Sequence, residues 1–263
     1  MTDLDGHVAV VTGGGGRLGR AIALELARAG AAVGIIDTRP EAAGAVAGAI
    51  EGQRGRAATA TGDVSIPADV DRALDALERS LGPADVLVNA HGIFPNRPIL
   101  EMDDEEWRRV FDVNTMGTMN TCRAVARRLV SRSAPGSIVN VSSGAATSAR
   151  AGSGHYASSK AAVNMLTHVL AIELGPHGIR VNAVAPGLVL DEVLREGDSH
   201  DSEYVRLMLR GTPLRRTGSP DDVAPAVVFL ASERSRWTTG AILEITGGSH
   251  CGRTHVPLSR ELR

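Results

Sequence analysis

Cysteine is scarce in this chain of 263 residues, which contains only Cys122 and Cys251. Two cysteines far apart in the sequence cannot build a disulfide framework or a zinc site with several cysteine ligands. Their scarcity is typical of proteins from a reducing compartment. We therefore expect no bound metal and a cytoplasmic location.

Long apolar runs and blocks of one charge are also missing. No stretch reaches the roughly 18 apolar residues that a membrane-spanning helix needs, and the first residues lack a signal-peptide pattern. The 28 basic and 30 acidic residues are mixed along the chain and give a formal net charge of -2. These absences argue against a membrane protein and against a nucleic-acid-binding protein.

Lysine is nearly absent, because Lys160 is the single lysine among the 28 basic residues. A bias toward arginine codons accounts for this composition without any function. The alternative is that Lys160 occupies a position where arginine cannot serve, since an ammonium group is compact and its pKa shifts readily.

The chain does contain a regular alternation of short apolar runs with longer amphipathic segments. This alternation predicts strands at 7–12, 32–36, 57–61, 86–88, 137–141, 180–184 and 242–245. It predicts helices at 17–29, 41–50, 68–81, 103–131, 153–174 and 220–231. Such alternation is typical of an α/β fold whose parallel strands are joined by right-handed crossovers. No repeat or linker divides the chain, so we expect residues 1–263 to form a single domain.

Two segments do not follow this rhythm. The charged, irregular stretch 188–216 follows a predicted strand, so it should lie at the carboxyl edge of the sheet, where ligands bind in such folds. We interpret it as a mobile substrate lid. The polar tail 249–263 has no periodicity, and it is either frayed or packed against a partner subunit.

A glycine-rich stretch, Thr12–Gly19, follows the first strand and opens the first helix. Glycine lets the backbone approach a pyrophosphate, which the helix amides and dipole favour. A tight turn without a ligand is the alternative. Asp37 ends the second strand, where it would bind the adenosine ribose and repel the additional phosphate of NADP, although it could instead cap the next helix. We therefore expect NAD as the cofactor.

Polar residues also end the third and fourth strands, at the same edge of the sheet. Asp63 would receive the adenine amino group, or it is a simple turn residue. Asn89, in Asn89-Ala90-His91-Gly92, either belongs to the cofactor site or ties neighbouring strands together.

The most informative pair is Tyr156 and Lys160, because residues four apart share one face of a helix. A phenol with a pKa near 10 is a poor base at neutral pH, and a nearby ammonium favours the phenolate. An exposed pair on a solvated helix is the alternative. Ser142 and Ser143 end the fifth strand, where a hydroxyl would hold a substrate oxygen against the phenol or satisfy backbone groups. Asn114 is unfavourable inside a predicted helix, which suggests a buried hydrogen bond and a water that relays protons to Lys160.

With these motifs the chain resembles the short-chain dehydrogenase/reductase family, in its compact single-domain branch, from about Asp5 to Gly248. The resemblance implies a Rossmann-type, doubly wound parallel sheet of order 3-2-1-4-5-6-7 with helices on both faces. It implies a catalytic tetrad of Asn114, Ser143, Tyr156 and Lys160, and NAD(H)-dependent interconversion of a secondary alcohol and a ketone. Tyr156 would be the general acid and base, Lys160 would lower its pKa, and Ser143 would position the substrate oxygen. A homotetramer, with a dimer as the alternative, would form through the helices that carry Asn114 and Tyr156.

The residues expected to bind the cofactor come from the strand ends, the catalytic helix and a Pro-Gly turn after the sixth strand. They are Gly13, Arg17, Leu18, Gly19, Asp37, Asp63, Val64, Asn89, Ala90, Gly92, Tyr156, Lys160, Pro186, Gly187 and Val189.

The chain departs from the family pattern at four places. Arg17 stands where the middle glycine of the nucleotide loop is usual, and His91 lies in a modified Asn-Asn-Ala-Gly motif. Asp191 replaces a frequent threonine, and Thr246 replaces the aspartate of an Asp-Gly-Gly motif. These differences suggest a lineage with its own substrate.

The substrate pocket is expected to be lined by 94–97, 144–155 and 188–210. In the second stretch, Arg150 either contacts an anionic substrate or is a solvated loop residue. A nucleotide-binding sensor or scaffold without turnover is the main alternative to an enzyme. An epimerase or dehydratase is disfavoured, because its longer carboxyl-terminal domain has no room here.

Overall fold

The structure is a computed structural model that describes residues 3–195 and 202–252. Its seven strands are all parallel and form one sheet of order β3-β2-β1-β4-β5-β6-β7, as predicted. The strands are β1 (Val8–Thr12), β2 (Ala32–Asp37), β3 (Ala57–Thr61), β4 (Val86–Asn89), β5 (Gly136–Val141), β6 (Ile179–Pro186) and β7 (Ile242–Ile245).

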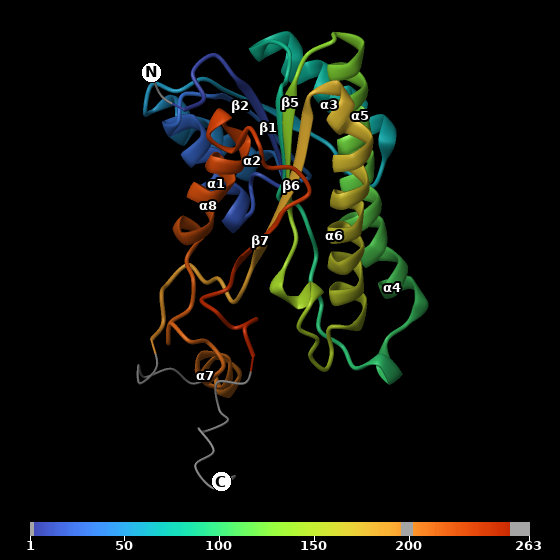
Figure 1. Ribbon diagram of the computed structural model, residues 1–263, viewed down its shortest axis with the longest axis vertical. Helices are drawn as coiled ribbons and strands as arrows, with labels where there is room; N and C mark the ends of the chain where they lie inside the picture. Colours follow the sequence, from blue (N-terminus) through green and yellow to red (C-terminus); the bar gives the residue numbers. More distant parts are fainter. Residues whose placement is uncertain (1–2, 196–201, 253–263) are drawn as a thin grey trace, which may run out of the picture.

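Helices cover both faces of this sheet (Figure 1). They are α1 (Arg17–Arg28), α2 (Pro40–Glu51), α3 (Pro67–Leu81), α4 (Asp104–Phe111), α5 (Gly117–Ser131), α6 (Gly154–Leu174), α7 (Glu203–Arg210) and α8 (Pro220–Ala231). One face is covered by α1, α2 and α8, and the other by α3, α5 and α6. The fold is therefore the doubly wound Rossmann type that the sequence predicted.

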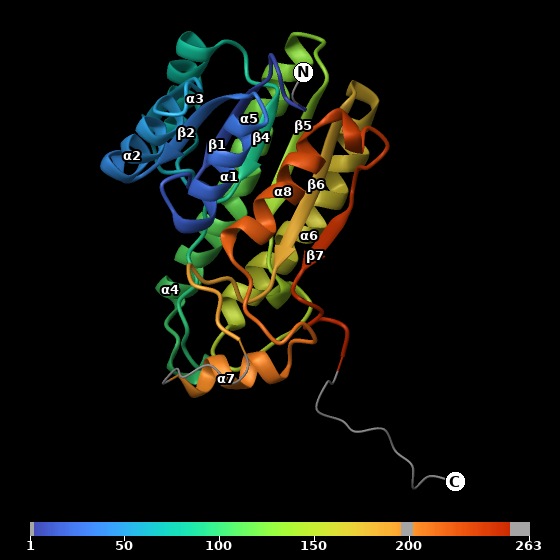
Figure 2. The same cartoon turned by 90° about the vertical axis from the view of Figure 1, so that its left-hand side faces the viewer.

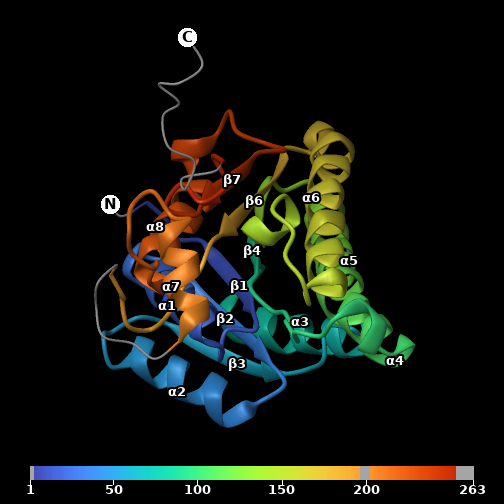
Figure 3. The same ribbon diagram turned by 90° about the horizontal axis from the view of Figure 1, so that it is seen from below.

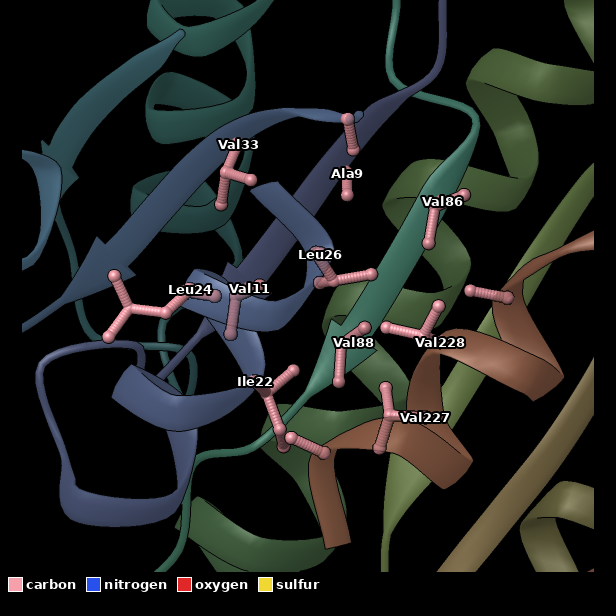
Figure 4. Packing of buried hydrophobic residues seen from close by; sticks show 14 of the residues in the cluster. Ala9, Val11, Ile22, Leu24, Leu26, Val33, Val86, Val88, Val227 and Val228 are labelled. Carbon is pink, nitrogen blue, oxygen red and sulfur yellow. The ribbon is translucent and has the colours of Figure 1, made fainter. Parts of the chain in front are cut away.

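Two apolar cores hold these layers together. In the first, Ile22 and Leu26 of α1 and Val227 of α8 pack on Val11 and Val88 of the sheet (Figure 4). In the second, side chains of α3 and α5 pack on the opposite face of the same strands. Strands buried on both faces read as continuous apolar runs, which is why the sequence pattern located the strands well.

Two features of the elements were not predicted. The helix predicted at 103–131 is present as an unbroken helical run, but it contains a π-helical turn, Asp112–Met116, between α4 and α5, where Asn114 bonds to another segment of the chain. The segment 188–216 was expected to be irregular but contains α7, whose Val205 and Leu209 are buried on one side. Part of this segment, 196–201, and part of the tail, 253–263, lie outside the described residues.

The carboxyl edge of the sheet is seen from below in Figure 3, where the segment containing α7 lies in front of it. Figure 2 shows α7 beyond the ends of the strands, on the same side as the loops that follow β4 and β5. Among the described residues no helix is long and apolar enough to cross a membrane.

Candidate active site

The strand register brings polar residues together at the carboxyl edge. Thr12 of β1 pairs with Asn89 of β4, and Asn89 pairs with Asn140 of β5. The Asn89 amide donates to Asn140 Oδ1 (2.9 Å), and its oxygen accepts from Thr121 (2.7 Å). The side chain of Asn89 therefore ties strands and helix together, which was the alternative given for it above.

Tyr156 lies in the first turn of α6, beside Ser143 at the end of β5. In place of the lowered value expected from the sequence, burial raises the pKa of Tyr156, while the nearby Ser143 hydroxyl and the charge of Arg150 act in the opposite direction. The phenol is therefore the protonated form at neutral pH, ready to donate a proton.

Lys160 lies one helical turn after Tyr156 and is only 4% exposed. Its ammonium donates a hydrogen bond of 2.8 Å to the carbonyl oxygen of Val141 in β5. Burial lowers the pKa of Lys160 to about 8. The alternative of an exposed tyrosine–lysine pair is thus wrong for the lysine.

Asn114 is fully buried in the π-helical turn. Its side-chain oxygen accepts from the Ile93 amide and its nitrogen donates to the Ile93 carbonyl, each at 2.9 Å. The same nitrogen lies 3.0 Å from Ser159 Oγ. The side chains of Asn114 and Lys160 both lie beside Gly92. A Cβ atom added to Gly92 would be 3.3 Å from Asn114 Oδ1 and 3.4 Å from Lys160 Nζ, so the two polar groups lie close to one another.

A cleft of about 270 Å³ lies beside this group, along the ends of β1 to β4. Predicted cofactor residues line it, namely Gly13, Asp37, Asp63, Val64 and Gly92. Two arginines that were not predicted to bind the cofactor, Arg39 and Arg109, also line it. The structure thus gathers five of the predicted cofactor residues around one cavity.

The glycine loop between β1 and α1 is closely packed. A Cβ atom on Gly13, whose φ is +65°, would lie 2.6 Å from the Cα atom of His91. Gly19 and Leu18 lie in the first turn of α1, whose amino end has no side-chain cap. Asp37 accepts from the Gly15 amide (2.9 Å) and lies 3.3 Å from the Arg39 Nε atom. Asp63 accepts from Ser65 and lies 3.9 Å from Arg109, so it is both a turn residue and part of the cleft wall.

Pro186 is the last residue of β6, and Gly187 follows it. Gly187 is required there, because a Cβ atom would lie 2.9 Å from the Cα atom of Thr246. Arg17 donates to the Val189 carbonyl oxygen (3.1 Å), and its Nε atom lies 3.5 Å from Asp191 Oδ1. Two departures from the family pattern, Arg17 and Asp191, thus contact each other. Ala90, between Asn89 and His91, donates its amide to Thr12.

The sequence left the role of Arg150 open. In the structure its guanidinium group lies 5.2 Å from the centre of the Tyr204 ring in α7. The residue also hydrogen-bonds to the Tyr204 hydroxyl. It is therefore an exposed side chain that connects the loop before α6 with the segment 188–216.

Sequence reasoning missed several residues of this region. Ser159 on α6 contacts Asn114, and Glu106 on α4 contacts His155. The pattern Tyr-x-x-Ser-Lys placed Ser159 on the helix of Tyr156, which was an available signal. Nothing local to the sequence indicated Glu106, because it lies 49 residues from its partner.

Comparisons with known proteins agree with this arrangement. A family model described as enoyl-(acyl carrier protein) reductase matches residues 16–250. The chain is 39% identical over 249 residues to a (3R)-3-hydroxyacyl-CoA dehydrogenase of Mus musculus, covering 92% of this chain and 95% of that protein.

Solved structures are similar as well. A short-chain type dehydrogenase/reductase from Mycobacterium marinum has a TM-score of 0.87 and 34% identity, with 95% of this chain and 97% of that chain covered. A gluconate 5-dehydrogenase from Burkholderia cenocepacia, solved with NADP and tartrate, has a TM-score of 0.87 and 32% identity, with the same shares covered. The chain belongs to the short-chain dehydrogenase/reductase family of oxidoreductases, whose members use nicotinamide cofactors.

Proposed function

We propose that this protein interconverts a secondary alcohol and a ketone, with NAD(H) as the hydride carrier. The observation that carries the proposal is the Tyr156 phenol beside Ser143, with the buried Lys160 one turn further along α6. In this proposal Asn114, Ser143, Tyr156 and Lys160 are the catalytic residues.

Each side chain has a distinct part in the reaction. The nicotinamide cofactor supplies or accepts the hydride at the carbon of the substrate. Ser143 donates a hydrogen bond that holds the substrate oxygen, and Tyr156 gives its proton to that oxygen in reduction and removes it in oxidation. Lys160 places a positive charge near the phenol, which favours the phenolate left after the transfer. Asn114, fixed by Ile93 and Ser159, anchors the path that returns a proton toward Lys160.

The residues at the cleft fit a dinucleotide. Gly13 and Gly19 keep the loop close to the sheet, and the uncapped amino end of α1 offers amides and a favourable dipole to a pyrophosphate. Asp37 would accept hydrogen bonds from the ribose hydroxyls, and its charge disfavours a 2′-phosphate. Arg39, which is paired with Asp37, is the group that opposes this preference. The balance supports NAD, although the similar gluconate dehydrogenase was solved with NADP.

The direct experiment is a binding titration with NADH and with NADPH, followed by a turnover assay that monitors the absorbance of the reduced nicotinamide. The panel contains ketones, sugars and cyclic alcohols. We expect tighter binding of NADH and turnover of at least one panel member. Equal or tighter binding of NADPH would contradict the cofactor assignment. Tight binding without turnover across the panel would favour a sensor or scaffold protein instead.

A further inference from the structure

The first turn of α6, which carries Tyr156, is held in an unusual way. Ser153 occupies the N-cap position, but its hydroxyl bonds to the Arg150 carbonyl (2.8 Å) and makes no cap bond. The Tyr156 amide donates instead to His155 Nδ1, at 2.8 Å. An amide of the first turn has no partner within the helix, so this side chain satisfies a group that would otherwise lack one.

The His155 ring is also held by contacts with α4. Its side chain is fully buried, and its ring stacks on Trp107 of α4 with 6.5 Å between ring centres. Because Nδ1 accepts a hydrogen bond, the ring proton of the neutral imidazole is on Nε2. Nε2 lies 3.0 Å from Glu106 Oε1, so it donates to this carboxylate.

Glu106 connects His155 to a second segment. Its other oxygen accepts from Arg97 Nε at 2.8 Å, in the loop that follows β4. Hydrogen bonds from His155 and Arg97 lower the pKa of Glu106, so the carboxylate is charged at neutral pH. The backbone amide of Arg97 also donates to the Gly152 carbonyl (2.8 Å), just before α6.

The same loop returns to the phenol. Phe94 packs edge-on against the Tyr156 ring, with 6.2 Å between ring centres and an angle of 66°. The contacts therefore form a circuit that runs from the Tyr156 amide through His155 and Glu106 to Arg97. The backbone of the loop joins Arg97 to Phe94, which contacts the Tyr156 ring. The loop that carries Phe94 is one of the three stretches expected to line the substrate pocket.

We propose that Arg97, Glu106 and His155 are positioning residues, which set the direction of the Tyr156 phenol and couple it to the stretch 94–97 that is expected to line the substrate pocket. The inference rests on the proposed function, in which Tyr156 transfers the proton. Proton transfer depends steeply on the distance and angle between the donor and the acceptor, so a small rotation of the phenol slows catalysis. A substrate that moves Phe94 would shift the phenol through this circuit.

The test is Glu106→Gln, which keeps the size of the side chain but removes its charge and one of its two acceptor oxygens. We expect kcat to fall about tenfold while the Kd for NADH stays within about twofold. Arg97→Gln should give a similar loss, and Arg97→Lys should restore part of it. Because both residues act through one carboxylate, the double variant Arg97→Gln/Glu106→Gln should lose no more than the worse single variant.

A matched control is available on α4, the helix that carries Glu106. Asp104 forms a salt bridge of 3.2 Å with Arg108, and both side chains are exposed. Asp104→Asn should leave kcat unchanged. If the losses of kcat in the two single variants multiply in the Arg97→Gln/Glu106→Gln double variant, the two residues are not coupled and the proposal fails. It also fails if Asp104→Asn lowers kcat as much as Glu106→Gln does.

A second readout does not depend on turnover. The ultraviolet absorbance of tyrosinate, measured against pH and corrected with Tyr156→Phe protein, follows the ionisation of Tyr156 alone. Burial raises the pKa of Tyr156, so loosening the loop should hydrate the phenol and lower that pKa in Glu106→Gln. Ser143 and Arg150, which act on the pKa of the phenol, and Lys160 on the same helix are unchanged in Glu106→Gln. If neither the titration of Tyr156 nor kcat changes in Glu106→Gln, Glu106 has only a structural role. This holds whatever the melting temperature of the variant. If the wild-type protein turns over no substrate, the proposed function fails, but this titration still decides whether the circuit sets the environment of the phenol.

Discussion

At the scale of single residues, Tyr156 and Lys160 differ in how burial acts on them. Burial disfavours the charged form of each, so it raises the pKa of the phenol and lowers that of the ammonium. The pKa of the ammonium therefore falls below that of the phenol. At neutral pH the phenol is protonated, and a positive charge near it is needed to favour the phenolate.

Replacing the phenol tests the proton donor. Tyr156→Phe removes only the hydroxyl, so the fold and the cofactor cleft should be retained. We expect NADH binding close to that of the wild-type protein and a kcat at least about a hundredfold lower, as for the loss of a general acid. Steady-state kinetics and a cofactor titration measure both quantities. Retained turnover would identify Tyr156 as the wrong proton donor.

The pKa of Lys160 can be observed directly, because the chain has one lysine. In protein labelled with isotopic lysine, a single Cε resonance should titrate near pH 8 in the absence of cofactor, whereas a solvated lysine titrates near 10.5. Below this midpoint the ammonium is charged, and above it the positive charge on the buried Nζ atom is lost. A midpoint above pH 10 would mean that water reaches the side chain.

At the scale of elements, the contact of Arg17 with Val189 and Asp191 joins the amino end of α1 to the segment after β6. These two elements flank the proposed cofactor site. Exposed ion pairs contribute little to stability, so we expect the contact to matter more for cofactor release than for the fold.

Variants at this contact should change cofactor release. Arg17→Gly and Asp191→Thr install the residue types usual in the family, and each should accelerate NADH dissociation by about threefold to tenfold, since one such contact is worth roughly 1 kcal/mol. Stopped-flow displacement measures this rate, and added salt should reduce the difference. Arg20→Ala, an exposed arginine one turn along α1, is the control. Faster release from Arg20→Ala to the same extent would contradict the role of the contact.

The elements also show how far a sequence can predict this structure. The strands were located to within about two residues, because a continuous apolar run between polar turns leaves little choice. The π-helical turn at Asn114 was not predictable, because it follows from bonds to Ile93, 21 residues away. The helix α7 was not predicted, because the charged residues in this segment obscured its apolar pattern. Val205 and Leu209 nevertheless have the i, i+4 spacing of a buried helix face.

The candidate site was predicted to a similar degree. Tyr156, Lys160 and Ser143 follow from motifs with fixed spacing, and the structure places them together. The circuit through Glu106 was missed, because it depends on how α4 packs against α6, and no local pattern records that packing.

At the scale of the whole molecule, α6 presents an apolar stripe to solvent. Met165 is 62% exposed, Ile172 is 77% exposed, and Val169 lies between them on the same face. Large apolar side chains gathered on one helix face are typical of interaction surfaces. We propose that this stripe forms part of the interface of a homotetramer.

Charged residues in the stripe should prevent that assembly. Met165→Glu/Ile172→Glu is expected to reduce the assembly to dimers or monomers, because burying unpaired carboxylates in an interface is costly. Light scattering coupled to size-exclusion chromatography measures the mass. Leu207→Glu, at an exposed position in α7, is a control that should keep the wild-type mass. A wild-type protein that is monomeric at all concentrations would contradict the proposal.

The proposed catalytic group is fastened largely to the main chain. Lys160 is held by the carbonyl of Val141, and Asn114 is held by both backbone groups of Ile93. Every residue has a backbone carbonyl, and every residue except proline has an amide hydrogen, so substitutions other than proline at 93 and 141 preserve these anchors. We therefore expect that side chains around the pocket can change, and the substrate with them, without displacing the proposed catalytic residues.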